Sequence, residues 1–337
     1  MTLIPRHNLA LAAFASLVSL LPALAIAQPA IVSDADAQAV ARSVGEQLHA
    51  AYPFPDIAER YAKALAAKAK AGAYRGLDDC DLATHMTDDL HAVHQDVHLR
   101  IFCDAVLSKK LAPKTDAAGT PKMKDLGFES VELDMDLSTA YIRSQGGWRA
   151  NADTFRTAAA AMNLASQAKY VIIDLRGNPG GNGEVGRFLA SYFYPDGEEK
   201  YYLYGFEKDR EHNQQEWTYA YVPGPRLPDA KLYILVNKKT ASATEGFAYA
   251  MQQLKRATIV GQTTAGAGIA GDFRPLPNKM TVFLPVKMIV APHSSAGWEG
   301  TGVVPDVSTE PDTERAAVME LIRREIAVPP AAQPATD

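Results

Sequence analysis

The stretch YVIIDLRGNPGGNG, residues 170–183, decides the fold class of this chain. It opens with an apolar run, Tyr170–Leu175, that is typical of a buried strand. A glycine-rich turn follows and leads into Gly183–Tyr194, whose spacing of apolar residues predicts a helix. The turn exposes backbone N–H groups near a helix N-terminus, which suit an anion or a developing oxyanion. The alternative is a tight turn without a ligand, since the spacing matches neither common phosphate-binding motif.

Strands and helices alternate on both sides of this stretch, which predicts an α/β protein with a mainly parallel sheet. Val131, Leu133, Met135 and Leu137 alternate with acidic residues, as in a half-buried strand. We also expect helices at Ala152–Ala168 and Ala243–Leu254, and strands at Leu232–Val236, Thr258–Val260 and Met280–Val290.

Nearer the N-terminus, apolar residues recur at helical spacing from Ser33 to about Gln95. The pattern predicts three short helices in a small bundle, the first capped by Ser33 or Asp34. The second and third helices are expected at Asp56–Gly72 and Asp81–Gln95. The polar segment from Lys109 to Lys124 is interpreted as a linker or exposed loop.

The composition is that of an ordinary globular protein. The 337 residues include 34 Lys and Arg against 39 Asp and Glu, a net charge of −5, and no basic block occurs. Because nucleic-acid binders need clustered cations to neutralise phosphates, we expect no nucleic-acid partner.

The first 27 residues have the layout of a secretory signal peptide. Arg6 and His7 precede an apolar run from Leu9 to Leu21, which is shorter than the ~20 residues needed to span a membrane. The small-residue pattern Ala25–Ala27 follows, with no cysteine for a lipid anchor. We therefore expect cleavage after Ala27 and a secreted or periplasmic protein with no membrane anchor.

Cys80 and Cys103 are the two cysteines of the chain. In an oxidising compartment they are expected to form a disulfide, which would add about 3 kcal/mol of stability in the chain-entropy model. The alternative is two buried free thiols.

Three residues carry the side-chain types of a catalytic triad. Ser242 opens a predicted helix directly after a strand, where it is either an ordinary N-cap or a nucleophile assisted by the Ala243 N–H. His98 lies where the polar helix gives way to an alternating pattern, so it could act as a base from the helical part. Glu299 stands in a glycine-bordered loop after the last strand and could orient the histidine.

His91, His94 and His98 also share one helical face, a spacing that could hold a metal. Because no cysteine or second histidine cluster completes a ligand set, we expect neither a metal nor another cofactor.

Several segments in combination resemble the tail-specific, or C-terminal processing, serine peptidases. The segments are residues 170–181, TASATE at 240–245, RATIVGQTTAG at 256–266 and GVVPD at 302–306, so the resemblance covers roughly residues 120–315. The Asp-x-His-Leu setting of His98 and the Trp-Glu-Gly element at 298–300 are similar to the branch that includes interphotoreceptor retinoid-binding protein and the tricorn core protease. The resemblance implies an α/β fold with a crotonase/ClpP-like ββα core, here preceded by a small helical bundle.

The resemblance also implies roles for individual residues. Ser242 would be the nucleophile, His98 the general base and Glu299 its orienting acid. The backbone amides of the oxyanion hole would come from Gly181 and Ala243, with Gly180 as a less favoured donor.

Three departures from the family pattern bear on mechanism. The lysine that the serine–lysine branch places 25 residues after the serine is replaced by Ala267. Lys255 and Lys279 are the substitutes considered, and Lys255 would lie about 20 Å along the serine's own helix at ~1.5 Å per residue, too far to act. Val97 replaces the serine that precedes the tricorn histidine, and the loop Cys103–Phe128 is too short for a PDZ domain.

The resulting hypothesis is an exported serine peptidase, without a PDZ domain, that hydrolyses peptides or unfolded protein chains. The alternative is a non-enzymatic binder of a hydrophobic ligand, such as a retinoid or fatty acid, on the same fold. A crotonase-type acyl-CoA enzyme fits poorly with export, and the oligomeric state is left open. The predicted parts are a signal peptide at 1–27, an N-terminal helical domain at 28–105, a peptidase-like crotonase-type α/β domain at 120–315, and the end of a C-terminal helix with a loose tail at 316–337.

Overall fold

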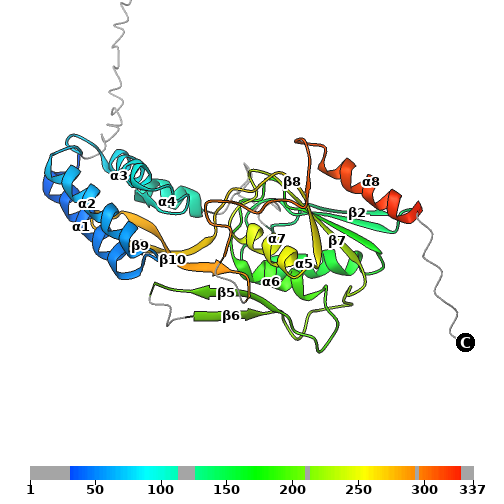
Figure 1. The fold of residues 1–337 in the computed structure, drawn as a ribbon. Coiled ribbons are helices and arrows are strands. Elements are labelled where there is room, and N and C mark those ends of the chain that lie inside the picture. The colour runs from blue at the N-terminus through cyan, green and yellow to red at the C-terminus, as the bar shows by residue number, and fades with distance from the viewer. Residues whose placement is uncertain (1–30, 113–125, 209–212, 293–295, 328–337) are drawn as a thin grey trace, which may run out of the picture.

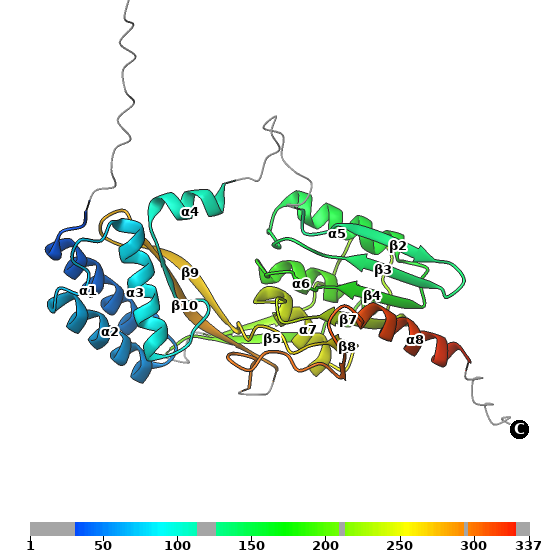
Figure 2. The same cartoon turned by 90° about the horizontal axis from the view of Figure 1, so that it is seen from above.

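The computed structural model describes residues 31–112, 126–208, 213–292 and 296–327. The expected signal peptide, most of the expected linker and the end of the expected tail lie outside these residues. Within the described ranges a helical bundle and a mixed sheet with its helices stand apart, and an antiparallel sheet connects them (Figures 1 and 2).

The bundle consists of the three helices that the sequence predicts. They are α1 (Asp34–Ala51), α2 (Pro55–Lys70) and α3 (Asp79–Val93). The Ser33 side chain caps α1 by accepting a hydrogen bond from the Asp36 N–H (3.1 Å). Val282 and Leu284, which are far away in the sequence, complete the apolar core between these helices. The bundle therefore packs against the antiparallel sheet, and the two share one apolar core.

Cys80 of α3 and Cys103 lie within disulfide distance, with Cα atoms 5.0 Å apart, as the sequence predicts. Cys103 is the N-cap of a further helix, α4 (Asp104–Leu111). The prediction of a linker from Lys109 was wrong at its start, because α4 continues to Leu111. An eight-residue helix is marginal alone, so its own residues carry only a weak helical signal.

The larger sheet has the order β11-β8-β7-β4-β3-β2, and all its neighbours are parallel except β2 and β3. Its strands are β2 (Ser130–Asp134), β3 (Thr139–Arg143), β4 (Tyr170–Asp174), β7 (Lys231–Val236), β8 (Ala257–Gly261) and β11 (Val307–Ser308). This confirms the predicted α/β class with a mainly parallel sheet. β2 is shorter than predicted, because the chain turns after Asp134, whose carboxylate accepts the Leu137 N–H (3.0 Å).

Helices cover both faces of this sheet (Figure 2). On one face lie α5 (Ala152–Leu164), α6 (Gly183–Ser191) and α7 (Ala243–Gln253), and on the other lies α8 (Glu314–Ala327). Helix α5 ends four residues before the predicted Ala168, since Ala165 is already its C-cap.

The antiparallel sheet was not predicted, apart from its longest strand. It contains β1 (Arg100–Phe102), β5 (Tyr201–Phe206), β6 (Asn213–Trp217), β9 (Ile269–Pro275) and β10 (Thr281–Val290). Strand β10 pairs with β1, β5 and β9 and extends from the bundle to the core. Most of β6 and β9 is exposed, so these strands lack the apolar alternation by which strands are recognised.

The topology brings two loops together. Strands β4 and β7 are parallel neighbours, with Asp174 opposite Leu235. The carboxyl ends of parallel neighbours lie at one edge of a sheet, so the loop with Gly180 and Gly181 meets the loop with Ser242. None of the described helices is long and apolar enough to cross a membrane.

Candidate active site

Ser242 lies on a sharp turn between β7 and α7. It is the N-cap of α7 and has φ 56° and ψ −123°, a left-handed backbone that is costly for a residue other than glycine. The Glu245 carboxylate accepts the Ser242 N–H (2.7 Å) and holds this conformation. Strained strand-to-helix turns present the side chain of a nucleophilic serine in α/β-hydrolases, and the geometry here is of that kind.

Glu245 is fully buried and organises the surroundings of the serine. Its carboxylate also accepts hydrogen bonds from the Thr264 hydroxyl (2.5 Å), the Gly266 N–H (2.7 Å) and the Ala267 N–H (2.9 Å). The loop at 264–267 is therefore fixed to the first turn of α7. In the sequence, Glu245 is the last residue of the TASATE motif, and its position three residues after Ser242 is the spacing of a capping box, which could have indicated this role.

The glycine-rich turn fits closely against the serine. A Cβ atom at Gly180 would lie 2.7 Å from Ser242 Cβ and collide with the Ala241 carbonyl oxygen. Gly181 has φ 135°, and a Cβ there would lie 2.7 Å from the Trp148 nitrogen. Both positions therefore require glycine.

Backbone hydrogen bonds distinguish the candidate oxyanion donors. The Gly180 N–H donates to Asn178 Oδ1 (3.1 Å), so it is already engaged. No hydrogen bond of the described residues uses the N–H of Gly181 or of Ala243. Both of these residues line the cavity that also contains Ser242. Two residues whose amides lack an internal acceptor within the described ranges therefore line the same cavity as Ser242.

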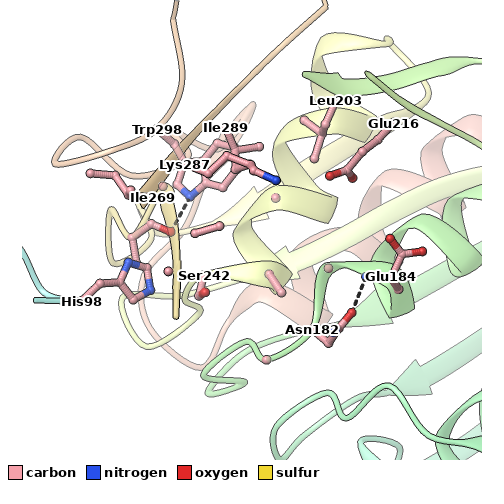
Figure 3. Close-up of a pocket in the computed structure, with 18 of the residues that line it drawn as sticks. His98, Asn182, Glu184, Leu203, Glu216, Ser242, Ile269, Lys287, Ile289 and Trp298 are labelled. Carbon is pink, nitrogen blue, oxygen red and sulfur yellow. Dashed lines mark hydrogen bonds between the residues drawn. The ribbon is translucent and has the colours of Figure 1, made fainter. Parts of the chain in front are cut away.

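The cavity has a volume of about 380 Å³. Figure 3 shows the His98 ring and the Ser242 side chain toward one end of it. The carboxylates of Glu184 and Glu216 lie toward the other end (Figure 3). The structure thus brings together two predicted site residues that are 144 positions apart in the chain.

His98 enters the cavity from the loop between α3 and β1. Its ring centroid lies 5.8 Å from that of Phe283, and its Nδ1 atom is buried without a hydrogen-bond partner among the described residues. Burial lowers the pKa of His98 below its ordinary value; the Lys110 charge also lowers it, whereas Asp96 opposes the shift. A histidine with a lowered pKa is neutral at neutral pH and can accept a proton.

Glu299 follows Trp298, which lines the cavity, but is not itself part of the cavity wall. Its carboxylate accepts the Gly268 N–H (2.5 Å), and no hydrogen bond joins it to the described atoms of His98. Burial first, and the negative charge of Asp96 second, raise the pKa of Glu299 to about 7. Of the three predicted triad side chains, the structure therefore places two in the cavity and holds the third on a neighbouring loop.

The lysine that lines the cavity is neither of the two that the sequence suggested, Lys255 and Lys279. Ala267 does line the cavity, at the position where the other branch has its lysine. Lys255 lies beyond the far end of α7, and Lys279 precedes β10. Lys287 of β10, which sequence reasoning did not consider, lines the cavity and donates to Gln214 Oε1 (3.0 Å). No local pattern indicates this position, because Lys287 stands in the cavity wall through the pairing of β10 with β9, where it lies opposite Ala270.

The histidine face considered for a metal is used otherwise. A ring nitrogen of His91 lies 2.9 Å from the Leu99 carbonyl oxygen, and His94 is exposed. Among the described residues no group of three or more histidine, cysteine or acidic side chains could hold a metal ion.

A strained serine at a strand-to-helix turn, two amides without an acceptor and a neutral histidine in one cavity define the class of serine hydrolases. The family model for peptidase family S41 matches residues 138–309, half of the chain, and a second model, for the N-terminal domain of this family in eukaryotic IRBP, matches residues 21–137. The chain therefore belongs to peptidase family S41, whose members are serine-type peptidases. The resemblance stated from sequence is confirmed.

Curated relatives are similar over part of their length. A carboxyl-terminal-processing protease from Synechocystis is 30% identical over 175 residues, which are 51% of this chain and 38% of the relative. A protease of the same name from Picosynechococcus is 27% identical over 237 residues, 64% of this chain and 54% of the relative. The matched region thus spans at most about half of either relative.

Solved structures share the fold across most of the chain. A lipoprotein from Streptococcus agalactiae has a TM-score of 0.58 at 14% identity, covering 86% of this chain and 96% of that one. The photosystem II D1 C-terminal processing protease has a TM-score of 0.53 at 15% identity, covering 87% and 97%. The tricorn protease has a TM-score of 0.56 at 12% identity, covering 87% of this chain and 37% of that one.

Proposed function

We propose that this protein is an exported serine peptidase in which Ser242 is the nucleophile and His98 the general base. The single observation that carries the proposal is the shared cavity of Ser242, His98 and the two unengaged amides. His98 takes the hydroxyl proton as Ser242 attacks a peptide carbonyl carbon. The Gly181 and Ala243 N–H groups then stabilise the oxyanion, and the imidazolium returns its proton to the leaving amine.

Glu299 completes the proposed triad as the group that orients His98. Glu299 accepts a hydrogen bond from Gly268, and Nδ1 of His98 has no partner among the described residues, so the Glu299 or the His98 side chain must move before the two can form a hydrogen bond. Catalytic hydrogen bonds are often long or unformed in enzymes without substrate and tighten on binding. The unpartnered and buried Nδ1 atom supports this part of the proposal, because a buried ring nitrogen without a hydrogen-bond partner is costly.

The proposed substrates are peptides or unfolded protein chains. The names of the relatives describe processing at carboxyl termini, and peptide hydrolysis fits the 380 Å³ cavity beside the serine. A substrate would be selected without a PDZ domain.

We further propose that the protein is exported and that its signal peptide is cleaved after Ala27. N-terminal sequencing of the secreted protein would test the cleavage site. The chain is proposed to divide into a helical domain at 28–105 and a peptidase domain at 120–315.

Labelling with a fluorophosphonate probe tests the proposal. Wild type, Ser242→Ala, His98→Ala and Lys287→Ala would be compared after circular dichroism has shown each to be folded. We expect labelling of wild type and Lys287→Ala, and its loss in the other two. Loss in Lys287→Ala with retention in His98→Ala would instead identify a serine–lysine mechanism.

A second candidate is a binder of hydrophobic ligands such as a retinoid or fatty acid. Apolar side chains of Leu203, Phe283, Ile289 and Trp298 form part of the cavity wall, which favours such a ligand. Stoichiometric binding of a fatty acid by a folded protein that neither labels nor hydrolyses peptides would support this function over the peptidase.

A further inference from the structure

The loop that carries His98 is built around Asp96. This carboxylate is almost completely buried, with 1% of its surface exposed. Its Oδ1 atom accepts the backbone N–H groups of His98 (2.9 Å) and Leu99 (3.2 Å). Its Oδ2 atom accepts the hydroxyl of Tyr52 (2.8 Å). One buried side chain thus connects the backbone of the histidine with Tyr52, which lies 44 positions before Asp96.

Two helices of the bundle supply the other side of this contact. Tyr52 is the C-cap of α1, and Tyr61 lies in α2; both are fully buried. Their rings meet edge to face with centroids 5.5 Å apart. The Tyr61 hydroxyl donates to the His94 carbonyl oxygen (3.0 Å), near the start of the same loop. The bundle therefore holds the loop at both ends.

Asp96 also acts on the site through its negative charge, in addition to its hydrogen bonds. It raises the pKa of His98 against the effects of burial and of Lys110 on α4. It also raises the pKa of Glu299, as does Glu245 on α7, while the amides of Gly268 and Ile269 lower it. A buried anion beside a histidine stabilises the imidazolium that forms during catalysis.

We infer that Asp96 and Tyr52 are positioning residues for His98: they tie its loop to the helical bundle and hold a negative charge beside the imidazole. The bundle is then part of the catalytic apparatus, since its integrity sets the position of the base. The inference deepens the proposed function, on which it rests for the role of His98.

The chain offers a matched control for the tyrosine. Tyr74 is also buried in the bundle, and its hydroxyl donates to the Asp89 carboxylate at the same distance of 2.8 Å. This pair touches neither the loop nor the cavity. A structural role alone predicts that Tyr52→Phe and Tyr74→Phe have the same effects.

The kinetic experiment compares these two variants with wild type on a peptide substrate. We expect Tyr52→Phe to lower kcat by between about 10-fold and 100-fold with little change in KM, because the base is displaced but substrate contacts remain. Tyr74→Phe should lower the melting temperature similarly and leave kcat within about twofold of wild type. Equal losses of kcat in the two variants would overturn the inference.

A titration of His98 by NMR tests the inference without turnover. It compares Ser242→Ala with Ser242→Ala/Asp96→Asn, in which asparagine keeps an acceptor for the two N–H groups but removes the charge. We expect the midpoint of the His98 titration to move to lower pH when the charge is removed, and an unchanged midpoint would overturn the inference. Because both proteins are inert by design, an inactive wild type would overturn only the proposed function. If Asp96→Asn does not fold, the His98 titration is compared in Tyr52→Phe and Tyr74→Phe, both in the Ser242→Ala background. A midpoint that moves only in the Tyr52→Phe variant supports the inference, and equal midpoints overturn it.

Discussion

The carboxylate of Glu245 accepts hydrogen bonds from the backbone N–H of Ser242 at 2.7 Å and of Ala267 at 2.9 Å. One buried side chain thus supports the strained turn of the proposed nucleophile and the loop that lines the cavity beside it. Two further donors to this carboxylate, the Thr264 hydroxyl and the Gly266 N–H, belong to the same loop.

Glu245→Ala should therefore have a lower free energy of unfolding than wild type and lose activity. Four donors would lose a buried acceptor, and breaking such a network costs about 3 to 5 kcal/mol. Urea denaturation measures the loss, and Glu46→Ala, an exposed position on α1, is the control. A loss below about 1 kcal/mol would contradict the role of Glu245.

Gly181→Ala should abolish activity and destabilise the fold. Its φ of 135° is unfavourable for alanine, and the new Cβ would clash with the Trp148 backbone, so we expect a cost of at least about 2 kcal/mol. Gly183→Ala is the control for stability, because a Cβ there meets nothing within 4 Å. Thermal unfolding of both variants checks the prediction, and similar melting temperatures would refute it.

Stability should depend on pH through Glu299. The pKa of this carboxyl is about 7 in the folded protein against an ordinary value of 4.5. The folded state thus binds the proton more tightly; this stabilisation is complete below pH 4.5 and is lost as pH rises through 7. Glu299→Gln, which stays uncharged, should gain melting temperature relative to wild type between pH 5 and pH 8. Glu46→Gln should show no such gain, and parallel curves for wild type and Glu299→Gln would disprove the prediction.

The pH dependence of kcat/KM should identify the base. Burial lowers the pKa of His98, so the acid limb should have its midpoint below 6.5, the ordinary value for histidine. A lysine base would place the limb at higher pH unless its own pKa were strongly lowered. Rates measured from pH 4 to pH 10 on wild type and Lys287→Ala check this. A limb above pH 7 that disappears in Lys287→Ala would exclude His98 as the base.

Local sequence was sufficient for the elements that direct the site. The apolar run ending at Asp174, the glycine turn and the helix at Ala243 each carry their own pattern within about ten residues, and all three were predicted close to their observed limits. The family resemblance followed from the same segments. The types of residue that could form a triad were also visible, because nucleophile, base and acid each stand in a recognisable local setting.

Tertiary structure alone decided how those residues are arranged. The antiparallel sheet, the position of Lys287 in the cavity and the hydrogen bond of Glu299 to Gly268 depend on partners that lie tens of residues away or more. The contact between Asp96 and Tyr52 spans 44 positions and couples the bundle to the loop of His98. The local sequence pattern indicates which face of a helix or strand is buried, whereas the packing of whole elements decides which partner a side chain meets. The sequence therefore determined which chemical groups are present, and the fold determined which of them can act together.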